Sequence, residues 1–198
     1  MGNLPSIDLN KIRYVFLDRD GVLNRKPPAG GFVTCCEGLE LLDGVAEGVA
    51  ALNRSGRKVI VATNQRGIAL GLFSADDLAR IHALLQARLA ASGAHLDAIY
   101  VCPHDRGQCG CRKPLPGLFE QAFRDFPDAK PENSLMAGDS LRDIEAGVRL
   151  GMKTAFISAG NSNSDEDRRA RQLANICAGS LAELVHQHFG CVIPSSRS

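Results

Sequence analysis

One short stretch, Tyr14-Val15-Phe16-Leu17-Asp18-Arg19-Asp20-Gly21, joins an apolar run to two aspartates and a glycine. The run from Tyr14 to Leu17 is too short for a helix and rich in strand-forming residues, which is typical of a buried central strand in a parallel sheet. Ligands of such sheets bind beyond the carboxyl ends of the strands. Because Gly21 permits a sharp turn, we expect Asp18 and Asp20 to face one crevice.

Two carboxylates this close together would repel each other unless a cation lay between them. A hard divalent ion, most simply Mg²⁺, suits oxygen ligands and would also screen an incoming phosphate from the carboxylate that attacks it. The alternative is a capped loop whose two acids are only solvated. Asp18 and Asp20 are therefore candidates for a metal site and for phosphoryl transfer.

Later apolar runs also end in polar side chains. Thr63 and Asn64 follow the run from Val59 to Ala62, and their hydroxyl and amide groups can donate hydrogen bonds to phosphate oxygens. Lys113 comes after the run from Ile99 to Cys102, where it could neutralise charge during phosphoryl transfer. The alternative for Lys113 alone is an ordinary surface lysine.

The run from Leu135 to Gly138 ends at Asp139, and Asp143 follows one helical turn later. Asp139 is a candidate metal ligand, and the alternative for this residue taken alone is a helix N-cap. Because parallel strands present their carboxyl ends at one edge of the sheet, we expect all these polar residues to form one site.

Apolar runs alternate with amphipathic stretches along the chain, which predicts βαβ units. We therefore expect an α/β fold: a single Rossmann-like, three-layer domain over residues 1–198 with a central parallel sheet. Helices are expected at Leu39–Asn53, Ser74–Ala91, Leu115–Phe126 and Leu141–Leu150 and from Leu181 onward, with strands at Thr154–Ile157 and Ala174–Ala178. A surface loop is expected at Asn161–Asp167, and frayed ends at residues 1–10 and 192–198.

The composition argues against several kinds of partner. The chain has 198 residues, enough for one buried core, and its 23 basic and 22 acidic residues give a net charge of +1. No global field therefore attracts nucleic acid or a membrane surface. The chain begins without a signal-like segment, and no apolar run approaches the length of a membrane span, so we expect a cytoplasmic protein. We also expect a monomer.

In chain order, Asp18-x-Asp20, Thr63, Lys113 and Gly138-Asp139-x-x-x-Asp143 resemble the four motifs of the haloacid dehalogenase-like (HAD) superfamily of phosphatases. The resemblance implies that Asp18 is the nucleophile, which forms an aspartyl-phosphate. It implies that Asp20 protonates the leaving oxygen and later deprotonates the hydrolytic water. Thr63 and Lys113 belong to the same catalytic set.

The resemblance also implies a Mg²⁺ ion held by the carboxylate of Asp18, the main-chain carbonyl of Asp20 and the carboxylate of Asp139. Asp143 would help to hold these ligands in position without contacting the ion itself.

Three residues are assigned to substrate binding: Asn64, Arg112 and Arg19. The planar guanidinium of Arg112 suits a second, non-reacting phosphate or the sugar, although Arg112 could instead pair with a nearby acid.

The segment Cys102-Pro103-His104-Asp105-Arg106-Gly107-Gln108-Cys109-Gly110-Cys111 supplies three thiolates and one imidazole. Cys102, His104, Cys109 and Cys111 form the ligand set of a closed tetrahedral zinc site, with no position left for water. A structural zinc would supply folding energy to this zinc loop, residues 102–111. The alternatives are unligated side chains or a Cys109–Cys111 disulfide, which a cytosolic location disfavours.

Within the HAD group, this zinc loop beside the Asp-Arg-Asp-Gly, Thr-Asn-Gln and Cys-Arg-Lys-Pro motifs resembles two related families. They are the D-glycero-D-manno-heptose 1,7-bisphosphate 7-phosphatases, which serve lipopolysaccharide and heptose-nucleotide synthesis, and the histidinol-phosphate phosphatases. The segment from Asn64 to Gly71 is closer to the heptose family, except that Leu70 replaces an arginine usual there. The four-residue spacer between His104 and Cys109 is nearer the histidinol-phosphate family.

The resemblance thus implies a phosphoric monoester hydrolase whose substrate is a small phosphorylated sugar, with histidinol phosphate as the second candidate. About 40 residues separate Asp20 from Thr63, and one helix and one strand occupy much of that length, so no folded cap domain is expected. Specificity would then depend on loops, including Arg25–Gly38. Two other classes stay open: a zinc-stabilised binding protein without catalysis, and a phosphotransferase.

Overall fold

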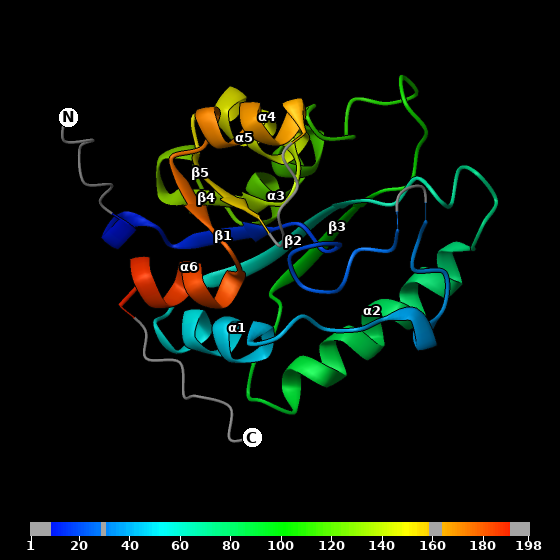
Figure 1. Cartoon of the computed structure of the whole chain (residues 1–198), viewed down its shortest axis with the longest axis horizontal. Coiled ribbons are helices and arrows are strands. Elements are labelled where there is room, and N and C mark those ends of the chain that lie inside the picture. Colours follow the sequence, from blue (N-terminus) through cyan, green and yellow to red (C-terminus); the bar gives the residue numbers. More distant parts are fainter. Residues whose placement is uncertain (1–8, 29–30, 159–163, 191–198) are drawn as a thin grey trace.

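The computed structural model describes residues 9–28, 31–158 and 164–190 of the chain. Its centre is a six-stranded parallel sheet with the strand order β3-β2-β1-β4-β5-β6 (Figure 1). The strands are β1 (Tyr14–Leu17), β2 (Lys58–Asn64), β3 (Ala98–Cys102), β4 (Ser134–Gly138), β5 (Lys153–Ile157) and β6 (Ile176–Ala178). Every neighbouring pair is parallel, so the predicted α/β class is confirmed.

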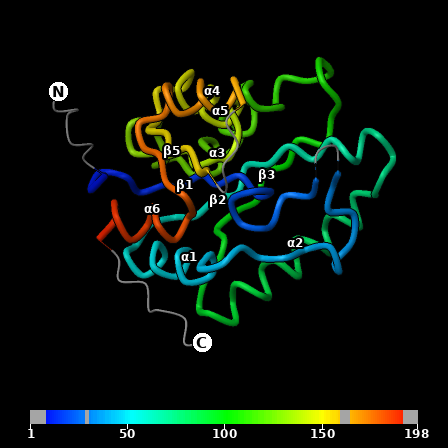
Figure 2. Tube along the Cα trace, in the orientation of Figure 1, coloured from blue at the N-terminus to red at the C-terminus, as the bar shows by residue number. Residues whose placement is uncertain are grey.

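Helices cover both faces of this sheet, as the ribbon and the Cα trace show (Figures 1 and 2). One face carries α1 (Val45–Arg54), α2 (Ala75–Ala90) and α6 (Leu181–His188). The other face carries α3 (Gly117–Asp125), α4 (Leu141–Leu150) and α5 (Asp165–Leu173). Short 3-10 helices lie at Leu9–Lys11, Cys36–Gly38 and Pro131–Asn133. This arrangement confirms the predicted three layers.

The side chains of β1 alternate between the two hydrophobic cores. Val15 and Leu17 pack with the core that includes residues of α1, α2 and α6. Tyr14 and Phe16 pack on the opposite face, where the Phe16 ring lies 5.3 Å from the ring of Phe119 in α3. All four side chains are at most 8% exposed. Because β1 is buried on both faces, it gives a rigid base to the residues that follow it.

Strand β1 also lies where the strand order changes direction. The chain first builds outward from β1 through β2 to β3, and then returns to add β4, β5 and β6 on the other side of β1. In open α/β sheets, ligands bind at this switch point, beyond the carboxyl ends of the strands. Asp18 directly follows β1 and Asp139 directly follows β4, so both aspartates lie at this position.

The helix expected at Leu39–Asn53 begins later, at Val45, so its predicted start is wrong. Gly44 has a left-handed backbone with a φ of 71°, which ends any helix approaching from Leu39. Leu39 is extended and packs into the core. Its apolar side chain therefore matched the hydrophobic spacing of a helix although its backbone is not helical.

The surface loop expected at Asn161–Asp167 is wrong in its second half. Residues from Asp165 form the first turn of α5, and Ser164 Oγ accepts a hydrogen bond from the Asp167 amide at 3.0 Å. The acids of this turn favour the positive end of the helix dipole. Residues 161–163 lie outside the described residues.

The predicted ends and two further boundaries also need adjustment. Leu9 is buried and begins a 3-10 helix, so the prediction of fraying is wrong for residues 9 and 10, whereas residues 1–8 and 191–198 lie outside the described residues. The edge strand expected at Ala174–Ala178 is β6, which begins at Ile176 because Ala174 still caps α5. The helix expected at Leu115–Phe126 is α3, one or two residues shorter at each end.

The connections at the carboxyl edge of the sheet are short. Between β1 and β2 the described residues form one 3-10 helix and α1, and between β2 and β3 they form α2. Loops, and not a cap domain, therefore border the carboxyl ends of these strands. Nowhere in the described ranges is a helix both long enough and apolar enough to cross a membrane.

Candidate active site

The predicted polar residues converge at the carboxyl ends of β1, β2 and β4. One cavity of about 160 Å³ is lined by Asp18, Asp20, Thr63, Asn64, Arg112, Asp139 and Asp143. Two other predicted site residues, Lys113 and Arg19, lie behind its wall. The loop after β1 adds Lys26 and Phe32 to the lining, so part of the Arg25–Gly38 loop borders the cavity.

A buried ammonium group supports the floor of this cavity. Lys113 is 1% exposed, and its Nζ lies 3.0 Å from Asp18 Oδ1 and 2.6 Å from Asp143 Oδ1. The same Nζ donates a hydrogen bond to the Ala62 carbonyl at 2.6 Å. Burial opposes the charge, but Asp143 and Asp18 outweigh it and raise the pKa of Lys113. Lys113 is thus a fixed internal cation and not a surface lysine.

Asp18 needs more positive charge than Lys113 supplies. Burial raises the pKa of Asp18 to about 7, against the attraction of Lys113, and the neighbouring carboxylates of Asp143, Asp139 and Asp20 add to the rise. An ionised Asp18 therefore calls for a further cation close by.

The side chains present fit a divalent cation. Carboxylate oxygens of Asp18, Asp139 and Asp143 lie within 4.8 Å of one another, and Asp139 Oδ1 is buried with no hydrogen-bond partner among the described residues. Asp139 Oδ2 already attracts a cation, since Lys26 Nζ lies 2.7 Å away. Gly21 permits this geometry: a Cβ there would lie 2.1 Å from Asp139 Oδ2.

Asp143 is held by the first turn of its own helix. Its Oδ2 accepts hydrogen bonds from the Ser140 hydroxyl at 2.6 Å and the Ser140 amide at 3.1 Å, while Oδ1 faces Lys113. Gly138 leaves room for this carboxylate, because a Cβ at that position would lie 2.2 Å from Asp143 Cβ. Asp143 is therefore placed to fix Lys113 behind the other acids.

Asp20 is held by hydrogen bonds from several sides. Its carboxylate accepts from Arg19 Nη2 at 2.9 Å, Asn24 Nδ2 at 2.9 Å and Gln65 Nε2 at 3.0 Å. Burial would raise the pKa of Asp20, but Arg19, Asn24 and Gln65 outweigh it and lower the pKa. The apo carboxylate is thus ionised and fixed in one orientation.

The predicted substrate contact of Arg19 is wrong. Its side chain is 0% exposed, its fork binds Asp20, and Nη1 lies 3.3 Å from His82 Nε2 on α2. A guanidinium buried in this way offers no atom to a ligand in the cavity. Arg19 instead positions Asp20.

Thr63 and Asn64 both lie at the cavity wall, but their side chains have different hydrogen-bond partners. Thr63 Oγ1 accepts a hydrogen bond from Gln65 Nε2 at 2.9 Å, which leaves the hydroxyl proton available to a phosphate oxygen. Asn64 clamps the backbone of Lys113: its Oδ1 accepts from the Lys113 amide at 3.1 Å, and its Nδ2 donates to the Lys113 carbonyl at 3.2 Å. Asn64 therefore positions Lys113 while it borders the cavity.

The zinc loop brings its four predicted ligands together. The Sγ atom of Cys109 lies 3.5 Å from Cys102 Sγ and 3.3 Å from Cys111 Sγ. His104 Nδ1 lies 3.8 Å from Cys102 Sγ and 3.4 Å from Cys111 Sγ. A tetrahedral zinc has ligand separations of about 3.5 to 3.8 Å, given Zn–S and Zn–N bonds of about 2.3 and 2.0 Å. The four side chains thus fit zinc, and Cys109 and Cys111 are free thiols.

Arg112 extends from this loop to the cavity. Its Nη1 donates to the His104 carbonyl at 3.4 Å, and no carboxylate of the described residues forms an ion pair with it. Burial lowers the pKa of Arg112, and Arg142, Arg106 and Arg66 lower it further. The alternative of pairing with a nearby acid is therefore not realised within the described residues.

Sequence reasoning assigned no role to Asn24, Gln65, His82 or Arg142. The role of Gln65 could have been predicted from the sequence, because Gln65 directly follows Thr63 and Asn64 at the polar end of the same strand. Asn24 lies only four residues after Asp20, within the turn that Gly21 begins. His82 carries no local signal, since only the packing of α2 brings it to Arg19.

Comparison with known proteins agrees with this geometry. The profile of the HAD-hydrolase-like family matches residues 110–184. A D-glycero-alpha-D-manno-heptose-1,7-bisphosphate 7-phosphatase of Mycobacterium bovis is 46% identical over 132 residues, which cover 66% of this chain and 69% of that protein. The D-glycero-beta-D-manno-heptose-1,7-bisphosphate 7-phosphatase of Vibrio cholerae is 35% identical over 180 residues, which cover 87% of this chain and 94% of the relative.

A solved structure extends the agreement to three dimensions. The D,D-heptose 1,7-bisphosphate phosphatase of B. bronchiseptica, crystallised with magnesium and phosphate, has a TM-score of 0.80 and 32% identity and covers 90% of this chain and 99% of its own. The sequence identity of 35% to the V. cholerae protein extends over 87% of this chain, which is more similarity than a shared fold alone would give. This chain therefore belongs to the heptose-1,7-bisphosphate 7-phosphatase family of HAD-like phosphatases.

Proposed function

We propose that this protein is a Mg²⁺-dependent phosphatase that removes the 7-phosphate of D-glycero-D-manno-heptose 1,7-bisphosphate, acting in the cytoplasm as a monomer. The observation that carries the proposal is the convergence of Asp18 and Asp139 on one cavity, with the buried ammonium group of Lys113 paired to Asp18. The names of the relatives and the magnesium and phosphate of the B. bronchiseptica structure support the substrate and the ion.

The chemistry follows from the positions of the carboxylates. An Asp18 oxygen attacks phosphorus and forms the aspartyl-phosphate, while the bond from phosphorus to the sugar oxygen breaks. Asp20 is ionised in the free protein, so it takes up a proton when the anionic substrate binds beside it and then gives that proton to the leaving oxygen. A water then attacks the phosphoryl group and loses a proton to Asp20, which releases phosphate and restores both carboxyl groups.

Several neighbours prepare this reaction. Lys113 offsets the negative charge that gathers beside Asp18, and Thr63 donates its hydroxyl proton to a phosphate oxygen. Arg19 and Gln65 keep Asp20 aimed at the leaving oxygen. When bound, Mg²⁺ supplies two positive charges that draw the phosphate toward Asp18. Asp18 and Asp139, with the Asp20 carbonyl, are the ligands we propose.

A structural zinc ion is proposed for Cys102, His104, Cys109 and Cys111. All four protein ligands would be used, so the ion would have no open position for catalysis. Its role would be to hold the loop that carries Arg112 at the cavity wall.

Histidinol phosphate is the second candidate substrate, favoured by the four-residue spacer between His104 and Cys109. The test compares kcat/KM for both anomers of heptose 1,7-bisphosphate with kcat/KM for histidinol phosphate, with Mg²⁺ and with EDTA. We expect the higher value for a heptose bisphosphate, and no turnover with EDTA. A higher value for histidinol phosphate would overturn the substrate, and Mg²⁺-independent turnover would overturn the metal.

A further inference from the structure

A second cavity opens beside the active site, with a volume of about 440 Å³. It shares Arg112 and Arg142 with the active-site cavity, and adds Arg106 from the zinc loop. The active-site cavity of about 160 Å³ is smaller than the roughly 300 to 1,000 Å³ of small-molecule sites. It has room for the reacting end of a substrate, and the rest would extend past the two shared arginines.

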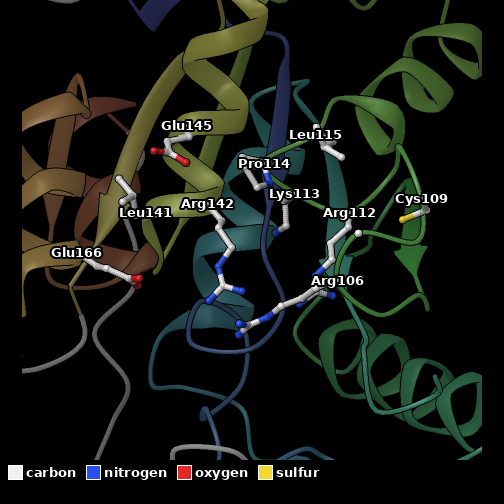
Figure 3. Close-up of a pocket in the computed structure, with 11 residues that line it drawn as sticks. Arg106, Cys109, Arg112, Lys113, Pro114, Leu115, Leu141, Arg142, Glu145 and Glu166 are labelled. Carbon is white, nitrogen blue, oxygen red and sulfur yellow. The ribbon is translucent and has the colours of Figure 1, made fainter. Parts of the chain in front are cut away.

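Three elements each contribute one arginine to this second cavity. Arg106 comes from the zinc loop, Arg112 from the segment after it and Arg142 from the first turn of α4. Figure 3 shows the three side chains pointing into the same space. The acids adjacent to these arginines in the sequence have other partners: Asp105 is bound by Arg66, and Asp143 is bound by Lys113.

These arginines form no ion pair in the described parts of the chain, although Asp105 lies near enough to Arg112 for the two charges to attract each other. Arg112 also lies close enough to Arg106 and Arg142 to be repelled by both. Repelling guanidinium groups around a cavity are stabilised when an anion binds between them, and their forked donors match phosphate.

The wall of the second cavity opposite the arginines carries negative charge. Glu145 of α4 and Glu166 of α5 border the cavity on the far side of Arg142 (Figure 3), and Glu145 Oε1 lies 3.6 Å from Arg169 Nη2. Carboxylates repel a phosphate but accept hydrogen bonds from hydroxyl groups. A ligand with one anionic end and several hydroxyls would thus fit this cavity in one direction only.

We propose that Arg106, Arg112 and Arg142 bind the phosphate that is not cleaved, and that Arg106 and Arg142 set the preference for doubly over singly phosphorylated sugars. The inference rests on the proposed function, which places a bisphosphate in the site. It adds two residues from separate elements to the Arg112 contact.

The test measures kcat/KM for heptose 1,7-bisphosphate and for heptose 7-phosphate, and takes their ratio. Arg106→Ala and Arg142→Ala should each lower this ratio by about 10-fold or more, the value of one charge-assisted hydrogen bond. Arg142→Lys keeps the charge but loses the fork, and should recover part of the ratio. Arg149→Ala is the matched control, because Arg149 is exposed on the same helix and lines neither cavity.

A ratio unchanged within about twofold in both alanine variants would overturn the inference, since general damage lowers both kcat/KM values together. Zinc content, measured in parallel, shows whether Arg106→Ala leaves the loop intact. A wild type inactive on both heptose compounds would refute the proposed substrate instead. The same two compounds are then compared as competitors of para-nitrophenyl phosphate hydrolysis, where equal wild-type affinities would also overturn the subsite.

Discussion

At the scale of single residues, the site depends on a balance of charge around Asp18. Four carboxylates lie together with three cations, as the contacts among Asp18, Asp20, Asp139, Asp143, Arg19, Lys26 and Lys113 show. An incoming phosphate adds further negative charge. Lys113 cannot move to compensate, because Asp143, Asn64 and the Ala62 carbonyl hold it in place. A divalent cation is the group that restores the balance.

Replacing the nucleophile gives the first prediction. Asp18→Asn should lower kcat by at least about 1,000-fold, because an amide cannot form the aspartyl-phosphate. The melting temperature of the metal-free protein should not fall, since Lys113 keeps its ion pair with Asp143 and the neutral amide removes a buried carboxylate that costs folding stability. The control is Asp165→Asn, whose side chain is 92% exposed and remote from the site. Turnover of Asp18→Asn near the wild-type level would refute the assigned nucleophile.

The raised pKa of Asp18 gives a second prediction. In the metal-free protein this pKa is about 7, against 3.8 for an aspartate without this environment. Ionising Asp18 in the folded protein therefore costs folding stability, and the cost grows as the pH rises between these two values. Mg²⁺ binds the ionised form, and its stabilisation should therefore increase with pH. Between about pH 5.5 and pH 8, the added stabilisation is about 2 kcal/mol, or about 4 to 8 °C in Tm.

Differential scanning calorimetry with and without Mg²⁺ measures this effect at each pH. In Asp18→Asn the pH dependence of the Mg²⁺ shift should become smaller, because Asp18 no longer titrates, whereas Asp139, whose pKa is also raised by burial, still does. A Mg²⁺ shift in wild-type Tm that is equal at both pH values would contradict the account.

Residue types at strand ends were predictable, but their orientations were not. Asp18, Thr63 and Asp139 each follow an apolar run, and parallel strands bring such positions together. Arg19 lies between two predicted site residues, yet its side chain turns inward to meet His82 of α2, 63 residues away. Sequence patterns do not specify such a contact, because it depends on how α2 packs.

At the scale of elements, the zinc loop has little apolar surface to hold it, so metal binding would supply much of its stability. We expect about one zinc per chain in the wild type, and much less in Cys109→Ser. Cys177→Ser should keep its zinc, because Cys177 is an exposed free cysteine outside the loop. Elemental analysis of the purified variants measures this, and equal zinc in both variants would refute the proposed ligands.

Among the elements, strands were predicted more accurately than helix starts. The run from Tyr14 to Leu17 coincides with β1, because a strand buried on both faces is uniformly apolar. Helix α1 starts late because Leu39 contributes to the core without being helical. Helix α5 starts early because its first turn consists of acids, which a hydrophobic pattern does not detect.

At the scale of the whole molecule, the sheet order places the switch point, the metal-binding acids and the cavity at one position. The alternation of strands and helices predicted this class of fold, since parallel strands require helical crossovers. The second cavity was not predictable, because its arginines come from separate segments that meet only in the folded chain. Two adjoining cavities suit a substrate that carries two phosphates.

The central claim is that the molecule cleaves the terminal phosphate at the Asp18 site while the other phosphate stays bound to the arginines. The most direct measurement is ³¹P NMR of heptose 1,7-bisphosphate during turnover with Mg²⁺. We predict that the C7 phosphomonoester signal is replaced by inorganic phosphate while the anomeric phosphate signal persists. Loss of the anomeric phosphate first, or no change in either signal, would contradict the account.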